Sequence, residues 1–369
     1  MGRRDPLLHR RIGVTTNRVI VMGSGPGRRF DAFKAAANRA GLHDVIPLAY
    51  GQTTQMRTGD WLRFESPDES ASAMRAVLDA GQAEAHRRGF TTTETTSSAT
   101  AQLAFGLRSF QEDALQTGVH VTASPKEIAL CYDKTRCASH LQAQGIPVPQ
   151  VFAPPPSFDA LLLLLRKEKR LFVKQRFGAG AAGTIALMAG PNDQVVAHTT
   201  VLHDATGSRF VKRVRRTSNI RELRAIFDFL RPSGLHVERW VPKAGVEGRT
   251  CDLRIVAVRN SPPFAVLRLS RGPITNLHLD AERAAAEALF SLMEPEKVDA
   301  LWSTVRKVQA AFPDSLTVAP DIAVTADLRS HVVLEVNAFG DHIRHMTIDG
   351  LTPQDWQIRQ MIRESSYAA

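Results

Sequence analysis

Residues able to hold a metal ion gather near the C-terminal end, in 332–341, which reads Val-Val-Leu-Glu-Val-Asn-Ala-Phe-Gly-Asp. The β-branched apolar run predicts a strand, and side chains alternate along a strand, so Glu335 and Asn337 share one face. A carboxylate and an amide oxygen are the hard ligands that Mg²⁺ takes. Asp321 opens the preceding apolar run, and a turn over 325–330 would bring it beside Glu335. We interpret the three residues as a candidate metal site; the alternative is a solvated strand end.

A lysine and a glycine-rich loop form the second candidate site. Lys174 interrupts an apolar strand predicted over 171–175, and Gly-Ala-Gly-Ala-Ala-Gly follows at 178–183. The loop matches G-x-G-x-x-G, but 184–188 alternates like a strand, whereas a dinucleotide-binding turn must open a helix. A protein kinase places its lysine after the glycine loop, not before it. We therefore expect a hairpin whose backbone N–H groups cover phosphates, with a closely packed turn of small residues as the alternative.

A second glycine-rich turn, at 23–27, lies between a predicted strand and a predicted helix. Such a turn can hold an anion at the helix N-terminus. Arg28 stands where the third glycine of a dinucleotide-binding turn belongs, which argues against that site. An NAD(P)-dependent oxidoreductase is therefore the least favoured interpretation of the chain.

Composition indicates a soluble globular protein of two or three lobes, with 369 residues, 43% of them hydrophobic and 23% charged. The longest apolar run, 161–165, is too short to cross a membrane, and residues 1–11 lack the apolar core of a signal peptide. Cys131, Cys137 and Cys251 fit no disulfide framework and no zinc-ligand spacing. We expect a cytoplasmic protein.

The net charge of +10 favours anionic ligands such as a nucleotide, a carboxylate, an acidic peptide or RNA. Basic residues concentrate in 209–224, where a solvated surface is the alternative to a binding face. No zinc-finger, bZIP or RNA-binding signature is present, so a nucleic-acid partner is left open without support. A homo-oligomer is also left open.

The elements that position these residues follow from periodicity and turn residues. The start of the chain reads as an α/β lobe. In it we expect strands at 18–22, 45–48 and 118–122 and helices at 28–40, 67–88 and 101–115. Beyond it we expect helices at 125–131, 133–144, 161–169, 281–293, 295–312 and 353–365, and strands at 171–175, 184–188, 236–241, 252–258 and 266–269, besides the two that carry the metal ligands.

In this order the parts resemble the ATP-grasp superfamily over roughly residues 120–345. Asp133-Lys134 precedes a helix and Gly-Ile-Pro-Val-Pro, and Phe-Val-Lys174 precedes the glycine loop. Val-Glu238-Arg-Trp-Val241 looks like the hinge that holds adenine.

The later segments continue the resemblance. Asp252-Leu-Arg254 looks like the acceptor-site strand, and Arg271 with Thr-Asn276-Leu-His is similar to a segment of peptide-ligating members. The ending Glu-Val-Asn-Ala-Phe-Gly-Asp resembles a poorly characterised bacterial ATP-grasp group.

The resemblance implies a role for each matched residue. The two lysines and the glycine loop would meet the ATP phosphates, and Arg254 would hold the oxygens of an acyl phosphate. Gly245 stands near the usual place of the acid that meets ribose, so Glu247 is only a candidate. The implied residues are Lys134, Lys174, Gly178, Gly180, Gly183, Glu238, Arg239, Val241 and Glu247 for the nucleotide, Arg254, Arg271 and Asn276 for catalysis, and Asp321, Glu335 and Asn337 for the metal.

The implied architecture is an α/β ATP-grasp fold preceded by a Rossmann-like pre-ATP-grasp lobe. The boundaries would be a basic tail at 1–14, the N-terminal lobe at 15–123 and an ATP-grasp domain at 124–369, with its nucleotide side at 124–240 and its metal and acceptor side at 241–369.

The implied activity is ATP-dependent ligation with Mg²⁺ or Mn²⁺: a carboxylate becomes an acyl phosphate, and an amine displaces phosphate to form an amide or peptide bond. Expected partners are a carboxylate and an amine, with an acidic peptide or a carrier protein as a candidate substrate in peptide or natural-product biosynthesis. An ATP-grasp kinase or a nonligating nucleotide-binding module is the alternative.

Overall fold

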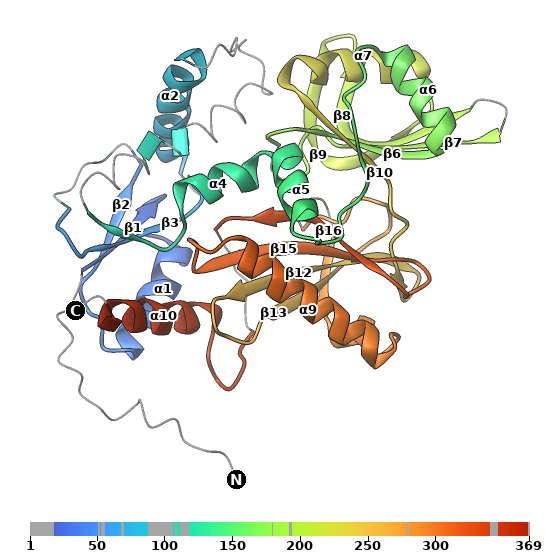
Figure 1. Cartoon of the computed structure of the whole chain (residues 1–369). Coiled ribbons are helices and arrows are strands. Elements are labelled where there is room, and N and C mark those ends of the chain that lie inside the picture. Colours follow the sequence, from blue (N-terminus) through green and yellow to red (C-terminus); the bar gives the residue numbers. More distant parts are fainter. Residues whose placement is uncertain are drawn as a thin grey trace.

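The described part of the chain folds around three β-sheets, which define three lobes (Figure 1). The computed structural model describes residues 18–50, 52, 56–67, 70–87, 106–107, 109–110, 118–178, 180–191, 194–277, 279, 281–339 and 346–367. The predicted tail at 1–14, most of the predicted helix at 101–115, and Asp341 lie outside these residues. No helix within them is long and apolar enough to cross a membrane.

The N-terminal lobe is a parallel sheet in the order β2-β1-β3-β4. Strand β1 is buried along its whole length, and α1 packs Phe30 and Phe33 into an apolar cluster with it. Strand β3 is missing from the predicted elements because Arg63 interrupts its apolar run; this arginine is buried in an ion pair with Glu65. The elements are β1 (Val19–Gly23), α1 (Arg28–Arg39), β2 (Val45–Ala49), β3 (Trp61–Phe64), α2 (Ala71–Arg87) and β4 (His120–Val121).

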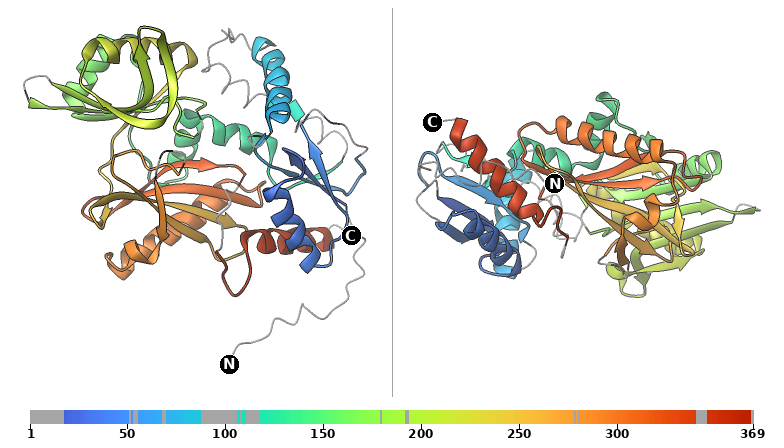
Figure 2. Two further views of the ribbon diagram at one scale, coloured as in Figure 1. Left: turned by 180° about the vertical axis from the view of Figure 1, so that it is seen from behind. Right: turned by 90° about the horizontal axis from the view of Figure 1, so that it is seen from below.

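The C-terminal helix α10 (Pro353–Tyr367) returns to the N-terminal lobe and lies beside α1 (Figure 2). Arg39 Nη2 lies 2.7 Å from Asp355 Oδ1, and the Trp61 indole donates to Ser365 Oγ at 2.9 Å. By its packing, the end of the chain therefore belongs with the first lobe.

The middle lobe is an antiparallel sheet in the order β5-β10-β6-β7-β8-β9. Helices α6 and α7 cover its outer face, and their apolar sides share one core with the sheet (Figure 1). The opposite face, which we call the inner face, is turned toward the C-terminal lobe. The elements are β5 (Val151–Phe152), α6 (Phe158–Glu168), β6 (Arg170–Gln175), β7 (Ile185–Ala189), β8 (Val195–Asp204), β9 (Gly207–Thr217), α7 (Ile220–Leu230), η4 (Arg231–Ser233) and β10 (Leu235–Arg239).

The C-terminal lobe is an antiparallel sheet in the order β14-β13-β12-β15-β16, with β11 paired to β12. Every residue of β15 is buried, and α9 packs against β12 and β15. Helices α4 and α5 lead into the middle lobe. The elements are α4 (Pro125–Tyr132), α5 (Lys134–Ala143), β11 (Gly245–Val246), β12 (Arg249–Val258), β13 (Phe264–Ser270), β14 (Glu282–Ala285), α8 (Glu287–Phe290), α9 (Pro295–Ala311), β15 (Thr317–Val324) and β16 (His331–Asn337).

The prediction of a helix over 281–293 is wrong. Its first part forms β14, which pairs with β13, and only Glu287–Phe290 is helical. Alanine-rich sequence favours a helix, but pairing with the edge of an existing sheet outweighs this local preference.

Candidate functional site

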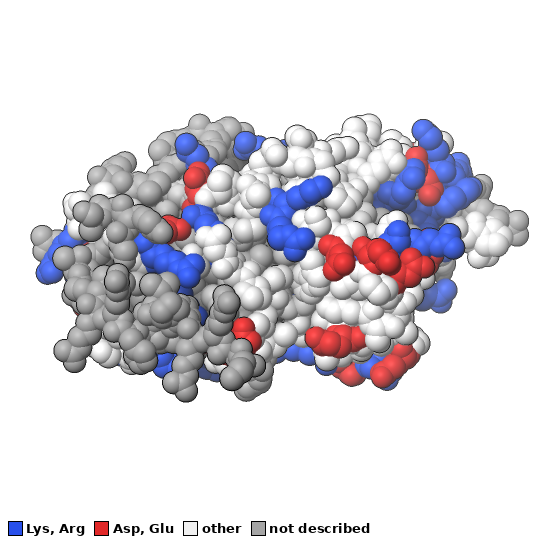
Figure 3. Space-filling model, turned by 60° about the horizontal axis from the view of Figure 1, so that its bottom comes forward, with Lys and Arg blue, Asp and Glu red and all other residues white. Residues whose placement is uncertain are grey.

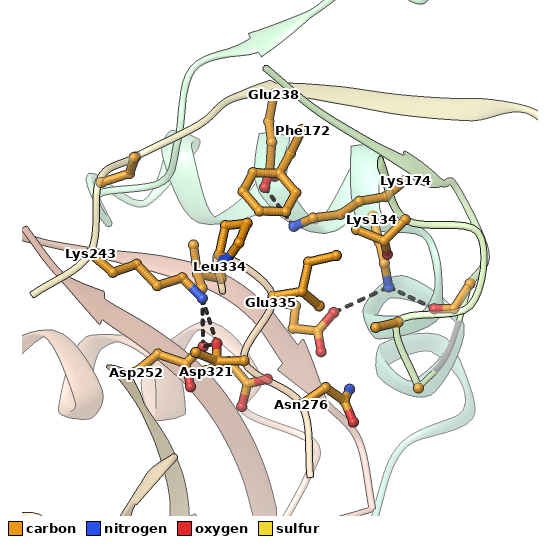
Figure 4. A pocket seen from close by; sticks show the side chains of 18 of the residues that line it. Lys134, Phe172, Lys174, Glu238, Lys243, Asp252, Asn276, Asp321, Leu334 and Glu335 are labelled. Carbon is orange, nitrogen blue, oxygen red and sulfur yellow. Dashed lines mark hydrogen bonds and ion pairs between the residues drawn. The ribbon is translucent and has the colours of Figure 1, made fainter. Parts of the chain in front are cut away.

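An open pocket lies between the inner face of the middle sheet and the C-terminal sheet (Figure 4). Most of the residues predicted for a site line it: Lys134, Lys174, Gly178, Gly180, Glu238, Arg239, Val241, Asn276, Asp321 and Glu335.

The middle sheet contributes a buried ion pair. Lys174 on β6 places its Nζ 2.5 Å from Glu238 Oε1 on β10. His236 Nε2 lies 2.9 Å from the other carboxylate oxygen, and its Nδ1 lies 3.1 Å from Thr135 Oγ1. Burial opposes ionisation of Glu238, but Lys174 and His236 outweigh it and bring the pKa of Glu238 down to about 2. The lysine that interrupts an apolar strand therefore stays charged beside a carboxylate.

Lys134 connects the glycine loop to the C-terminal sheet. It is the first residue of α5, whose N-cap Asp133 accepts a hydrogen bond from the Arg136 N–H at 3.2 Å. The Asp133 carboxylate also pairs with Arg176 at 2.7 Å, which fixes the start of the helix. Lys134 Nζ donates to the Gly178 carbonyl at 2.7 Å and lies 3.2 Å from Glu335 Oε2 (Figure 4).

The glycine loop joins β6 to β7 at the pocket, as the sequence predicts. Gly180 and Gly183 have φ angles of 60° and 69°, in the left-handed region that favours glycine. A Cβ on Gly183 would stand 2.8 Å from Gln175 Cγ. The Gln175 amide is buried at the pocket wall, and neither of its polar atoms has a hydrogen-bond partner. A ligand with acceptor oxygens, such as a phosphate, would satisfy the amide donor.

The two strands that carry the predicted metal ligands pair as the sequence predicts. Asp321 on β15 is opposite Glu335 on β16, and a turn over 325–330 connects the strands. A β-bulge, which periodicity does not reveal, makes Leu334 the extra residue of the pair. Leu334 and Glu335 both line the pocket, whereas Asn337 is not among its lining residues.

The donor set fits Mg²⁺ rather than a metal held by protein alone. Asn337 Nδ2 donates to the Ala319 carbonyl at 3.1 Å, which leaves the amide oxygen as its ligand atom. Among the described residues, no group of three or more His, Cys, Asp or Glu could hold a metal. Two carboxylates, Asp321 and Glu335, and one amide suit an ion that takes its other ligands from water and phosphate.

Positive groups dominate the electrostatics around these carboxylates. Burial opposes ionisation of Glu335, but Lys134 and Lys174 outweigh it and hold its pKa well below the ordinary value. Burial raises the pKa of Asp321, although Arg254 and Arg268 both pair with this carboxylate. A divalent cation would favour the ionised form of both acids.

The C-terminal sheet adds a charged network that sequence reasoning missed. Asp252 accepts from Arg268 Nε at 2.7 Å and from Lys243 Nζ at 2.9 Å, and Thr275 also donates to it. Arg268 Nη2 lies 2.9 Å from Asp321 Oδ2. Arg268 is almost fully buried within the apolar sequence Phe-Ala-Val-Leu-Arg-Leu-Ser. A single arginine in an apolar strand is the sequence feature that could have indicated a buried ion pair here.

Several predicted residues lie elsewhere. Glu247 is exposed beside Arg249 and does not line the pocket. Arg239 is a lining residue, but its guanidinium pairs with Glu168. Arg271 is exposed, and Arg254 pairs with Asp321; neither arginine lines the pocket. Gly183 does not line the pocket, and a side chain at this position would meet Gln175.

Comparison with solved structures identifies the fold. No protein-family model matches the chain, and no curated protein is similar to it in sequence. Among solved structures, D-cycloserine synthetase DcsG matches with a TM-score of 0.57 at 13% identity, covering 94% of this chain and 99% of that one. Biotin carboxylase from Campylobacter jejuni matches with a TM-score of 0.55 at 12% identity, covering 93% of this chain and 70% of that one.

A third structure is described as an ATP-grasp ligase. It is PsnB complexed with a minimal precursor, with a TM-score of 0.51 at 16% identity, covering 94% of this chain and 99% of that one. The matches cover nearly the whole chain, including the N-terminal lobe. The protein therefore has the α/β ATP-grasp fold that the sequence predicts.

Proposed function

We propose that the protein is an ATP-dependent carboxylate–amine ligase. One observation carries the proposal: a single pocket brings two lysines and a glycine loop face to face with the carboxylates Asp321 and Glu335. This is the charge arrangement that phosphoryl transfer to a carboxylate requires, because both reactants are anionic.

The middle sheet would bind ATP. The Lys174 and Lys134 ammonium groups would neutralise phosphate oxygens, and the glycine loop would cover them with backbone N–H groups. Glu238 and the Val241 backbone would meet the adenine edge. The unpartnered Gln175 amide supports a polar ligand under the loop.

Asp321, Glu335 and Asn337 would hold Mg²⁺, with Mn²⁺ as an alternative. When bound, the metal supplies positive charge that offsets the negative charge of the phosphates. Asp321 itself is positioned by Arg254 Nη2 at 3.1 Å and Arg268 Nη2 at 2.9 Å. We propose that these two arginines orient Asp321 and lend positive charge near the reacting oxygens.

The chemistry needs no covalent enzyme intermediate. A substrate carboxylate attacks the γ-phosphorus, the bond to the β-phosphate oxygen breaks, and ADP leaves with the bond electrons. An amine then attacks the carbon of the acyl phosphate, inorganic phosphate leaves, and the amine loses a proton to solvent. The pocket contributes by positioning the reactants and neutralising charge.

The substrate is proposed to be a peptide. The solved structures of MdnC and PsnB are complexes with precursor peptides. For this chain, the net charge of +10 supports a peptide with acidic residues. A cytoplasmic location is part of the same proposal, in keeping with three free, buried cysteines.

Hydroxylamine trapping tests the activity without knowledge of the amine. The protein is incubated with ATP, Mg²⁺ and a panel of amino acids and acidic peptides, and hydroxamates are identified by mass spectrometry. A ligase yields ADP and a hydroxamate in equal amounts, and Glu335→Gln lowers the formation of both about a hundredfold. ADP formation with a phosphorylated product and no hydroxamate would identify a kinase instead.

A further inference from the structure

A row of side chains crosses the inner face of the middle sheet, from the pocket to the sheet edge. The strand register pairs, in order, Glu238, Phe172, Ala186, His198 and Arg216. Directly paired residues on neighbouring strands share a face of the sheet. Because Glu238 and Phe172 line the pocket, His198 and Arg216 lie on the same face, on β8 and on the last strand, β9.

The segment that follows β13 lies over the middle of this row. Ile274 packs in one cluster with Phe172 and Ala186, and Val214 on β9 packs against that cluster. A Cβ on Gly272 would stand 4.0 Å from His198 Nδ1, so the backbone at 272 passes beside the imidazole. Arg271, the residue before Gly272 in the chain, is exposed.

Arg216 and Arg271 differ in their partners from Arg209 and Arg215. On β9, Arg209 pairs with Asp204 at 2.8 Å and Arg215 pairs with Glu222 at 3.0 Å. No acidic partner serves Arg216 or Arg271 within the described ranges.

Burial and the nearby Arg216 lower the pKa of His198, which agrees with a short distance between the two side chains. Elsewhere basic and acidic side chains lie side by side, as at one end of the face in Figure 3. On this part of the inner face, the positive charges of Arg216 and Arg271 therefore have no acidic partner among the described residues.

We propose that Arg216, Arg271 and His198 form an anion subsite that binds an acidic side chain of a peptide substrate. This inference rests on the proposed ligase function and specifies its substrate. Guanidinium groups bind carboxylates with strong charge-assisted hydrogen bonds, and a neutral imidazole adds one donor.

Two features favour a peptide over a small acid. Three inter-strand steps separate Phe172 from Arg216, so the subsite lies roughly 14 Å from the pocket wall, a span of about four extended residues. β9 is also the last strand of its sheet, so its outer backbone groups can pair with an extended chain.

The test uses fluorescein-labelled hexaglutamate as a probe, titrated with the full-length protein and followed by fluorescence anisotropy in the presence of Mg²⁺ and a nonhydrolysable ATP analogue. The subsite variant is Arg216→Glu/Arg271→Glu. Its matched control is Arg306→Glu/Lys307→Glu, which makes the same change in net charge on exposed positions of α9. Affinity for the ATP analogue is measured on all three proteins by calorimetry.

We expect hexaglutamate to bind the wild-type protein, and the subsite variant to weaken this binding by about tenfold or more, a loss of about 1.4 kcal/mol. The control should stay within about twofold of wild type, and free glutamate at equal residue concentration should not displace the probe.

Three results would overturn the subsite. One is absence of probe binding to the wild type, and another is equal weakening in both double variants. The third is that oligo(U) RNA or free glutamate binds at the same arginines more tightly than hexaglutamate does. ATP-analogue binding that persists through such a failure would leave the ligase proposal intact, whereas loss of nucleotide binding in the wild type would refute that proposal instead.

Discussion

Replacing Lys174 separates a structural role from a binding role. Lys174 neutralises Glu238, which is only 3% exposed and has one other partner, His236 at 2.9 Å. Removing one member of a buried ion pair typically costs about 3–5 kcal/mol, because the other charge is left uncompensated. Since His236 remains, Lys174→Met should lower the free energy of unfolding by about 3 kcal/mol, the lower end of that range.

The double variant Lys174→Met/Glu238→Gln removes both charges. Its stability should recover to within about 1 kcal/mol of wild type, so the second change should restore about 2 kcal/mol of the stability lost in Lys174→Met. ATP affinity should not recover with it. The lost ammonium group should weaken ATP binding about tenfold, or about 1.4 kcal/mol, in the single and in the double variant.

Urea unfolding followed by tryptophan fluorescence gives the stabilities, and calorimetry gives the ATP affinities. A double variant that recovers less than about 0.5 kcal/mol of stability relative to Lys174→Met would refute the buried pair as a source of stability. A double variant that binds ATP as well as wild type would remove Lys174 from the nucleotide site.

Three further predictions address the metal, the loop and the pH dependence. Glu335→Gln should keep the fold and most of the ATP affinity but lower ADP formation about a hundredfold, roughly 2.7 kcal/mol of transition-state stabilisation; near-normal turnover would contradict the metal assignment. Gly183→Ala should lower both ATP affinity and the free energy of unfolding, because φ is 69° at this position and the new methyl group would meet Gln175. In the wild-type protein, hydrogen exchange in the loop that does not change upon ATP binding would argue against a phosphate cover. Glu238 and Asp252 each have a pKa of about 2, which is lower than in the unfolded chain. Their contribution to stability is therefore complete above about pH 5 and is lost as pH falls toward 2. Equal urea midpoints at pH 5 and pH 3 would contradict this pH dependence.

The pairing of β15 with β16, the strands that carry the proposed metal ligands, was predictable because it depends on the local pattern of apolar and turn residues. Alternation put Glu335 and Asn337 on one face, and the short turn over 325–330 fixed which strand lies beside them. The bulge at Leu334 was not predictable, since it alters the register without leaving a trace in the hydrophobic pattern.

The charged network around Asp252 could not be assembled from sequence. Asp252 meets Arg268 because β12 pairs with β13, and Asp321 joins them because β15 pairs on the other side of β12. Lys243 comes from a loop. These contacts depend on the order of strands in the sheet, which periodicity does not give.

The C-terminal helix shows the same limit. Its amphipathic pattern predicted a helix at 353–365, but nothing in the pattern indicated that it would pack on the first lobe, with Asp355 beside Arg39. The helix predicted over 281–293 failed for the related reason that an available sheet edge captured its first residues.

Transfer of ¹⁸O tests the ligase proposal most directly. A carboxylate that yields a hydroxamate in the trapping assay is labelled with ¹⁸O in both oxygens and incubated with ATP, Mg²⁺ and the amine. Attack of the carboxylate on the γ-phosphorus predicts one ¹⁸O atom in each inorganic phosphate released, with formation of ADP and an amide. Unlabelled phosphate accompanying the amide would contradict activation through an acyl phosphate, and with it the role proposed for the pocket.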